Sequence, residues 1–387
     1  MSSSRRSTPF AAVLCSIIFV SILALAGCGT VSPGVYKVGV VLSLSGPAAP
    51  LGQAEQRAIE LLSKQIAEDG GIDGTELEFL VHDDASDPQK ANLAMSRLVD
   101  QEKVCAVIGC STSGSTLAIA PTADSRMIPV VAMAAGTQLT QPVKKYLFSV
   151  APSDSLVATR ILEYYRDGGV DRIAILHDSN AYGIGGADEV TRRAPAYGIT
   201  TVARESYGSA DTDMTPQLTR IQDTSAQSLL VWGTNPGPAI IAGNMRQLGM
   251  TMPFVGSSGI ANRTFIDLAG AASNGVVFAA SKLVLPQTIT DREWAAAVNE
   301  FGDAYLEEYG IEIDPVAAHG WDAANMIADA LREVGARKAE IHGWIQGLEQ
   351  YPGVDGVFNY SARDHAGLKP DALVMVRIEN GTWTEAQ

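Results

Sequence analysis

The sequence predicts an α/β protein made of two doubly wound lobes, each a parallel sheet covered by helices, joined by a multi-strand hinge. Short β-branched runs alternate along the chain with amphipathic helical patterns, which is typical of parallel sheets because parallel strands need crossover connections. About 360 residues remain after a leader segment, which is more than one core usually holds. Two domains are therefore expected.

The first 27 residues have the features of a signal peptide. Two arginines precede an uncharged run over 10–26, and the sequence Leu-Ala-Gly-Cys at 25–28 resembles a bacterial lipobox, in which Cys28 is lipidated and becomes the first mature residue. An ordinary signal with a chance cysteine would keep export and remove only the anchor. We expect an exported lipoprotein, with 28–35 as its linker, held at the cell membrane and facing the periplasm or the cell exterior.

Composition excludes several classes of partner. The chain has a formal net charge of −15 at pH 7, so nucleic acid is not an expected partner. The five histidines are scattered without ligand spacing, so no metal or other cofactor is expected. Cys105 and Cys110 would lie roughly 16 Å apart along a strand. That exceeds the ~7 Å limit for a disulfide, so both are expected to be unpaired.

The first lobe begins near residue 36. Its expected strands are 37–44, 77–81, 104–108 and 128–132. Its expected helices are 51–67, 88–102 and one that starts near Leu117. In the first helix Ala58, Ile59, Leu62 and Ile66 recur at three- and four-residue steps, so one face is expected to pack on the sheet.

A second alternating series follows a crossing near Pro152. Its expected strands are 172–176, 200–203, 229–232, 254–255 and 276–279. Two amphipathic helices after Lys282 have no strand between them, so we expect them to return to the first lobe. The closing strands, near Val357 and at 373–378, are expected to join the second lobe. The predicted division is 36–152 with 283–354 for lobe 1, and 153–282 with 355–387 for lobe 2.

The stretch 104–116, VCAVIGCSTSGST, is the strongest candidate for a binding loop. An apolar strand ends there in glycines and hydroxyl residues just before a helical pattern. The first N–H groups of a helix lack intrahelical partners and carry the positive end of the dipole, so they can hold a carboxylate without a cation. The competing interpretation is that these serines and threonines only cap the helix.

Loops that follow the predicted strands share this composition, and ligands of parallel sheets bind beyond the carboxyl ends of strands. Seven motifs occur in order: LSLSGPAAPLG, GGIDG, HDDASDP, IGCSTSGST, IPVVAMAAGT, PSD and HDSNAYG. Together they resemble the type I periplasmic-binding proteins, specifically the leucine/isoleucine/valine-type receptors of ABC importers. The resemblance covers nearly the whole mature chain. It implies two lobes that close on a small molecule, ABC permease subunits as partners, and no catalysis.

The resemblance also implies residues that clamp the ligand carboxylate. The matching positions are Ser113, Ala135 and Thr137. Ser115 and Thr116 lie nearer the expected helix and are equally well explained as caps.

Other positions match the family's contacts to the rest of the ligand. Asp154 matches an acid near the ligand amino group, with a helix N-cap as the alternative. Tyr182 matches an aromatic residue that covers the ligand from the second lobe, with packing at the lobe edge as the alternative. Val316, Trp232 and Trp321 are further candidates for covering the ligand tail.

Three positions depart from the amino-acid receptors. Ser258 stands where the family has the acid that pairs with the ligand ammonium, and Asn235 and Leu51 each replace an aromatic residue. A buried ammonium without its counter-charge costs several kcal/mol unless Asp154 compensates. The expected ligand is therefore a small amino acid, or a related carboxylate or amide that lacks the α-ammonium group.

Three functions follow from these observations. The first is a binding protein that presents its ligand to an importer, and the second is a sensor with the same fold that reports to a regulatory partner. The third, a serine hydrolase using Ser111 or Ser113, is disfavoured because 109–113 does not form a G-x-S-x-G elbow and no histidine lies in a general-base motif.

Overall fold

The structure, a computed structural model, describes residues 34–386. The predicted signal peptide and Cys28 lie outside the described residues. The described chain forms a five-stranded sheet, a seven-stranded sheet and a two-stranded hairpin. The predicted α/β class with two sheets is confirmed.

The first sheet is entirely parallel, with the strand order β2-β1-β3-β4-β5. Its strands are β1 (Tyr36–Leu42), β2 (Leu77–Asp83), β3 (Ala106–Gly109), β4 (Val130–Ala132) and β5 (Leu147–Ser149). The crossovers are α1 (Ala49–Glu68), α2 (Pro88–Arg97) with a π-helical turn (Leu98–Glu102), α3 (Ser113–Arg126) and α4 (Thr137–Thr140). All the strand ends that precede these helices therefore lie at one edge of the sheet.

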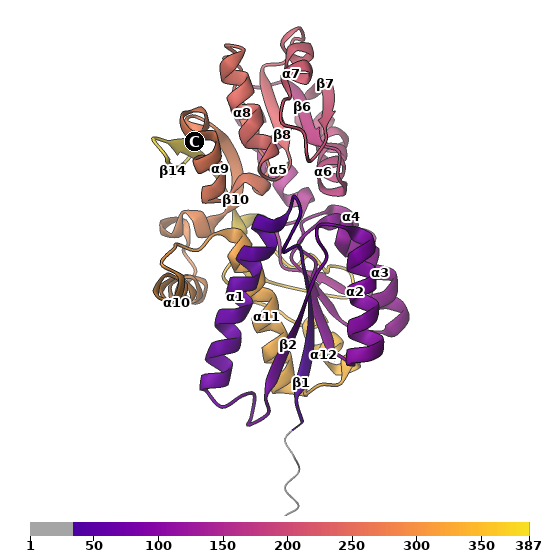
Figure 1. The fold of residues 1–387 in the computed structure, drawn as a ribbon. Helices are drawn as coiled ribbons and strands as arrows, with labels where there is room; N and C mark the ends of the chain where they lie inside the picture. The colour runs from indigo at the N-terminus through magenta and orange to yellow at the C-terminus, as the bar shows by residue number, and fades with distance from the viewer. Residues whose placement is uncertain (1–33, 387) are drawn as a thin grey trace, which may run out of the picture. The chain divides into compact units, whose positions relative to one another are not determined.

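Helices cover both faces of this sheet (Figure 1). Helices α2 and α3 pack on one face. The other face carries α1, α10 (Arg292–Tyr309), α11 (Pro315–Val334) and α12 (Lys338–Gln346). Ile59 of α1, Val298 of α10 and Ile327 of α11 share one core with Val40 of β1. The helices after Lys282 thus pack on the first sheet, although they follow the strands of the second.

The second sheet has the order β14-β13-β10-β9-β8-β6-β7. Its strands are β6 (Arg172–Asp178), β7 (Thr200–Tyr207), β8 (Ser228–Trp232), β9 (Phe254–Gly256), β10 (Val277–Ser281), β13 (Leu373–Glu379) and β14 (Thr382–Glu385). Helices α5 (Asp154–Asp167) and α6 (Ala181–Arg193) pack on one face; α7 (Thr215–Gln222), α8 (Gly237–Gln247) and α9 (Arg263–Ala269) pack on the other. Only β13 and β14 run antiparallel to their neighbours. The sheet is therefore mixed at one edge.

The chain near Val357 differs from expectation. It forms a hairpin of β11 (Tyr351–Pro352) and β12 (Val357–Phe358) instead of a strand of the second sheet. Phe358 and Leu368 belong to the core of the first sheet, which also includes residues of α11. After β12 the chain joins the second sheet at β13.

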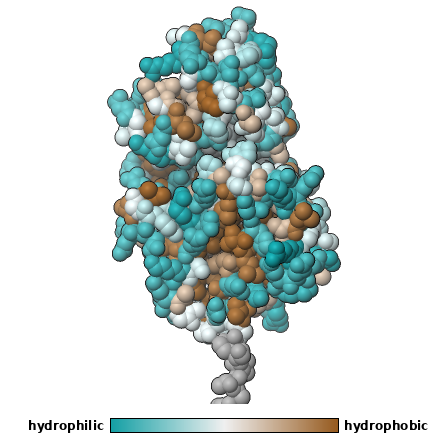
Figure 2. Space-filling model, viewed as in Figure 1, coloured by the Kyte–Doolittle hydropathy of each residue, from teal (hydrophilic) through white to brown (hydrophobic). Residues whose placement is uncertain are grey.

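Figure 2 shows one face of the molecule, on which apolar side chains gather over β2, between α1 and α2. Strand β2 is the edge of its sheet and is only partly buried, with Val81 exposed. Leu93 on the neighbouring α2 is also exposed. Within residues 34–386 no helix combines the length and the apolar character needed to span a membrane.

Candidate ligand-binding site

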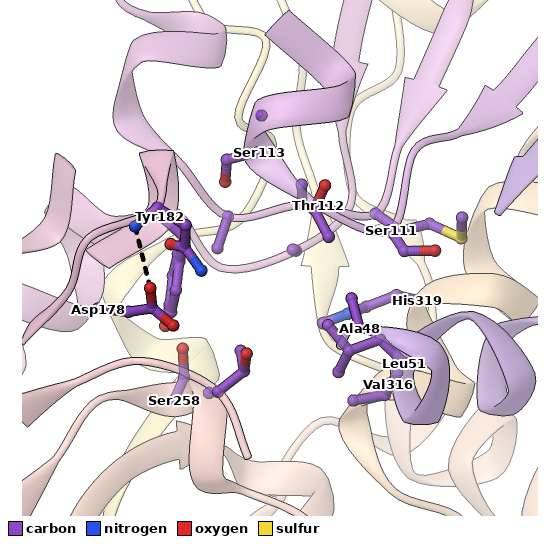
Figure 3. Close-up of a pocket in the computed structure, with 18 of the residues that line it drawn as sticks. Ala48, Leu51, Ser111, Thr112, Ser113, Asp178, Tyr182, Ser258, Val316 and His319 are labelled. Atoms are coloured by element: carbon purple, nitrogen blue, oxygen red, sulfur yellow. Dashed lines mark hydrogen bonds between the residues drawn. The ribbon is translucent and has the colours of Figure 1, made fainter. Parts of the chain in front are cut away.

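A cavity of about 350 Å³ lies where the carboxyl ends of both sets of parallel strands meet (Figure 3). Segments that follow β3, β4, β6, β8 and β9 all contribute to its wall. Helices α1 and α11 complete the wall on the side of the first sheet. Both sheets therefore supply residues to one site, as the positions of the polar loops suggested.

Helix α3 begins at Ser113, one turn earlier than expected. Thr112 is its N-cap and accepts a hydrogen bond from Ser115 N at 3.3 Å. The Thr116 hydroxyl donates to Thr112 O at 2.8 Å, and Ser115 is fully buried inside the first turn. Neither Ser115 nor Thr116 belongs to the cavity wall. This places Ser113 at the N-terminus of a helix that points at the cavity.

Ser113 links two loops of the wall. Its hydroxyl accepts a hydrogen bond from Gly136 N at 3.2 Å, which holds the segment after β3 against the segment after β4. The N–H groups of Ser113, Gly114 and Ala135 have no acceptor within residues 34–386, and all three residues line the cavity. Buried N–H groups are rarely left without a partner. They form a site suited to an anionic oxygen.

Glycine is required where β3 ends. Gly109 has a φ of +132°, and a Cβ atom at this position would lie 2.4 Å from the carbonyl oxygen of Val41 on β1. A side chain would separate the two strands and displace the loop that carries Ser113.

The structure places two of the expected contact residues behind the wall. Thr137 begins α4, and Asp154 begins α5, where Ser153 rather than Asp154 is the N-cap. Neither residue lines the cavity. Asp154 is fully buried without a hydrogen bond to its carboxyl oxygens. Burial raises the pKa of Asp154 well above its ordinary value, which favours the neutral form.

The second sheet contributes Tyr182, Asn235 and Ser258 to the wall. Tyr182 is the second residue of α6 and donates its hydroxyl hydrogen to Ser257 Oγ at 3.1 Å, which fixes the ring at the cavity edge. Asn235 Nδ2 donates to Asn262 Oδ1 at 3.0 Å, while its own Oδ1 is buried without a donor. This side of the site is therefore polar.

Across the cavity from Tyr182, Figure 3 shows Leu51 of α1 and Val316 of α11. Both were candidates from the sequence, and both line the cavity. The two tryptophan candidates do not. Trp232 is fully buried beneath α6, and Trp321 stacks on Phe301 with ring centroids 4.4 Å apart.

Sequence reasoning missed four polar residues of the wall: Glu55, Ser111 as a binding residue, Asp178 and His319. For two of them, Glu55 and His319, the helical spacing of the sequence could have indicated the position. Glu55 lies four residues after Leu51 and His319 three after Val316, so each shares a helix face with a predicted wall residue.

Asp178 accepts hydrogen bonds from Asn180 N and Ser209 Oγ. The Ser111 hydroxyl contacts the Glu55 carboxylate and accepts from Ser43 N.

The geometry does not resemble a hydrolase site. Within the described chain neither Ser111 nor Ser113 is hydrogen-bonded to a histidine that could act as its general base. Cys105 and Cys110 are buried free thiols, as expected. The part of the chain that the structure describes contains no group of three or more side chains suited to a metal ion.

Two sheets that aim their strand ends at a shared cavity, with free N–H groups on its wall, define a ligand-binding protein of the two-lobed class. A family model described as "Periplasmic binding protein" matches residues 35–382. The chain belongs to this family of binding proteins, and the resemblance drawn from its seven motifs is confirmed.

Known relatives agree with this assignment. The chain is 26% identical over 326 residues to a leucine-, isoleucine-, valine-, threonine- and alanine-binding protein of Pseudomonas aeruginosa, an alignment that covers 82% of this chain and 84% of that protein. The crystal structure of the branched-chain amino acid transporter substrate-binding protein LivJ from Streptococcus pneumoniae, in complex with isoleucine, superposes with a TM-score of 0.81. It is 28% identical and covers 91% of this chain and 99% of its own. An extracellular ligand-binding receptor from Rhodopseudomonas palustris HaA2, 24% identical, shares the fold with a TM-score of 0.84 over 90% of this chain and 99% of that one.

Proposed function

We propose that this protein is the exported substrate-binding component of an ABC importer, anchored to the membrane by a lipid on Cys28. Its cavity binds a small carboxylate of amino-acid size. The observation that carries this proposal is the set of free N–H groups of Ser113, Gly114 and Ala135 on the cavity wall. The names of the Pseudomonas and Streptococcus relatives, an amino-acid-binding protein and a transporter component, support it.

The wall is suited to a carboxylate although it carries no lysine or arginine. The N-terminus of α3 points into the cavity, and its unpaired N–H groups and dipole stabilise negative charge without a cation. The volume of about 350 Å³ is near the lower end of the range for small-molecule sites, which favours a small ligand.

The acid that the second sheet offers to an α-ammonium group is Asp178, since Ser258 and Asn235 are uncharged and Asp154 lies behind the wall. Asp178 already accepts hydrogen bonds from Asn180 N and Ser209 Oγ, and burial raises its pKa, which weakens it as a counter-charge. An ammonium ion there would lose hydration without gaining a full counter-charge. Carboxylates without an α-amino group therefore belong to the ligand class.

Binding and delivery follow from the arrangement of the wall. A ligand that touches both sheets stabilises the arrangement in which they are close together. The permease subunits of the importer would recognise this ligand-bound form. A lipid on Cys28 would keep the protein near those subunits.

The proposal is tested by thermal shift and calorimetry on the purified mature protein. Leucine, asparagine and 4-methylpentanoate are each compared with the derivative whose α-carboxyl group is a primary amide. We expect at least one of the carboxylates to bind and to raise the melting temperature, while its amide partner does not. If each carboxylate bound no more tightly than its own amide derivative, the proposed carboxylate site would be refuted.

A further inference from the structure

The wall around Leu51 and Val316 is not purely apolar. Glu55 lies on α1, His319 on α11, and Ser111 follows β3, and all three line the cavity. Figure 3 shows Ser111 and His319 on the side of Leu51, across the cavity from Tyr182 and away from Ser113. These three side chains therefore give the cavity a second polar region, where the far end of a ligand would lie.

Tight packing of two helices brings Glu55 and His319 together. A Cβ atom at Gly320 would lie 2.6 Å from the carbonyl oxygen of Glu55, so only glycine allows α11 to approach α1 this closely. His319 is the next residue along α11. Two side chains from opposite ends of the sequence thus reach the same wall.

Glu55 and His319 each have one polar side-chain atom in a hydrogen bond and one without a partner. The Ser111 hydroxyl is hydrogen-bonded to Glu55 Oε2, and His319 Nε2 lies 3.2 Å from Asp355 Oδ2. Within residues 34–386 neither Glu55 Oε1 nor His319 Nδ1 has a hydrogen-bond partner. A ligand that satisfied both atoms would form two hydrogen bonds that no residue of the wall supplies.

Charge decides which ligand tail suits this pair. Burial raises the pKa of Glu55 to about 8, only partly opposed by the Ser111 hydrogen bond, so the group is largely neutral at pH 7. Burial lowers the pKa of His319, but the surrounding acids, Asp355 first among them, together leave the pKa raised, which favours the imidazolium. An ammonium tail would face that imidazolium, and a carboxylate tail would face Asp355 and the nearby Asp84. A neutral tail with both a donor and an acceptor avoids both conflicts.

We propose that Glu55 and His319 recognise the far end of the ligand, and that the preferred ligand is a short carboxylate with a neutral carboxamide-like tail rather than a branched hydrocarbon. With the proton of the neutral acid on Oε2, toward the Ser111 oxygen, Glu55 Oε1 is a carbonyl oxygen that would accept from the tail N–H, and the tail carbonyl oxygen would accept from His319 Nδ1. Leu51 and Val316 would cover the methylene group between the two ends. This inference rests on the proposed function and specifies its substrate class.

The test uses ligands of nearly one shape. Leucine, asparagine and aspartate carry hydrocarbon, amide and carboxylate tails on the same branched skeleton. Two further ligands lack the α-amino group: 4-methylpentanoate corresponds to leucine, and succinamate corresponds to asparagine. Calorimetry on the wild-type protein is expected to show at least tenfold tighter binding of the amide-tailed ligand in one of two pairs. These pairs are asparagine against leucine, and succinamate against 4-methylpentanoate. Aspartate is expected to bind less tightly than asparagine.

Variants assign the preference to the two side chains. Glu55→Leu and His319→Leu should each abolish the preference for the amide and improve binding of the hydrocarbon partner. Glu60→Leu makes the same change at an exposed position of α1 and should leave the preference unchanged. Circular dichroism establishes that each variant is folded, and the wild-type comparison is decisive by itself if a variant fails to fold.

The possible failures are distinguishable. Equal or tighter binding of leucine and 4-methylpentanoate by the wild type would overturn this inference and leave the carboxylate site intact. An amide preference that survives in both folded variants would also overturn it. Absence of binding by every carboxylate would overturn the inference together with the proposed function.

Discussion

Gln138 Nε2 donates a hydrogen bond to the carbonyl oxygen of Ala181 at 3.1 Å, and this contact joins the two halves of the cavity. Gln138 belongs to α4, which follows a strand of the first sheet, whereas Ala181 begins α6 on the second sheet. The bond lies one residue from Tyr182, so the same turn that covers the cavity is also held to the opposite sheet. Closure of the site therefore depends partly on a contact that involves no ligand.

Gln138→Ala should weaken ligand binding without affecting the cavity wall. Loss of one hydrogen bond of this kind costs roughly 0.5–1.5 kcal/mol, which corresponds to about a two- to tenfold higher Kd. Calorimetry with the best ligand of the panel measures this change. Gln222→Ala, at an exposed position at the end of α7, serves as the control, and an equal effect of both changes would argue against a closing contact.

Ser113→Ala should weaken carboxylate binding by roughly 10- to 100-fold, because hydrogen bonds to charged groups contribute about 1.5–3 kcal/mol. The change also frees Gly136 N and loosens one loop of the wall. Ser125→Ala, at an exposed site of the same helix, should leave the Kd unchanged. Unaltered affinity in Ser113→Ala would show that the hydroxyl does not take part in binding.

The free energy of unfolding should fall as the pH rises from about 5 to about 8. Burial raises the pKa of Glu55 to about 8 and that of Asp322 to about 7 in the folded protein. The folded state therefore binds more protons than the unfolded state in this range, and raising the pH favours unfolding. Urea titrations followed by tryptophan fluorescence at several pH values measure the slope.

Glu55→Gln should reduce this pH dependence, because the amide stays neutral and keeps an oxygen that can accept from Ser111. Asp322 should maintain the remainder of the slope. Glu60→Gln on the exposed face of α1 is the matched control. A slope as steep in Glu55→Gln as in the wild type would mean that Glu55 is already ionised at pH 5.

Cys28→Ser should release the protein from the membrane fraction, because a serine cannot carry the thioether-linked lipid of the proposed lipoprotein. Fractionation followed by immunoblotting measures the distribution, and metabolic labelling with a fatty acid reports the modification. Cys105→Ser leaves Cys28 unchanged and should keep the protein on the membrane. A Cys28→Ser protein that still sediments with membranes would contradict the proposed anchor.

Local sequence predicted most of the strands and helices and several residues that line the cavity. Periodicity identified the strands and helices because each pattern is written in neighbouring residues. The hydroxyl-rich segment after β3 predicted a helix N-terminus at a strand end, and there Ser113 meets the cavity. Leu51, Tyr182 and Ser258 were likewise placed in loops or helix ends that reach the wall.

Only the tertiary structure decided which side chains share the cavity. Asp154 and Thr137 lie in the expected segments, yet the packing of α4 and α5 turns them behind the wall. Glu55 and His319 reach the same wall because α1 and α11 approach at Gly320, and Phe358 belongs to the core of the first sheet rather than to that of the second. Contacts between distant segments depend on how whole elements pack, which no local pattern of residues encodes.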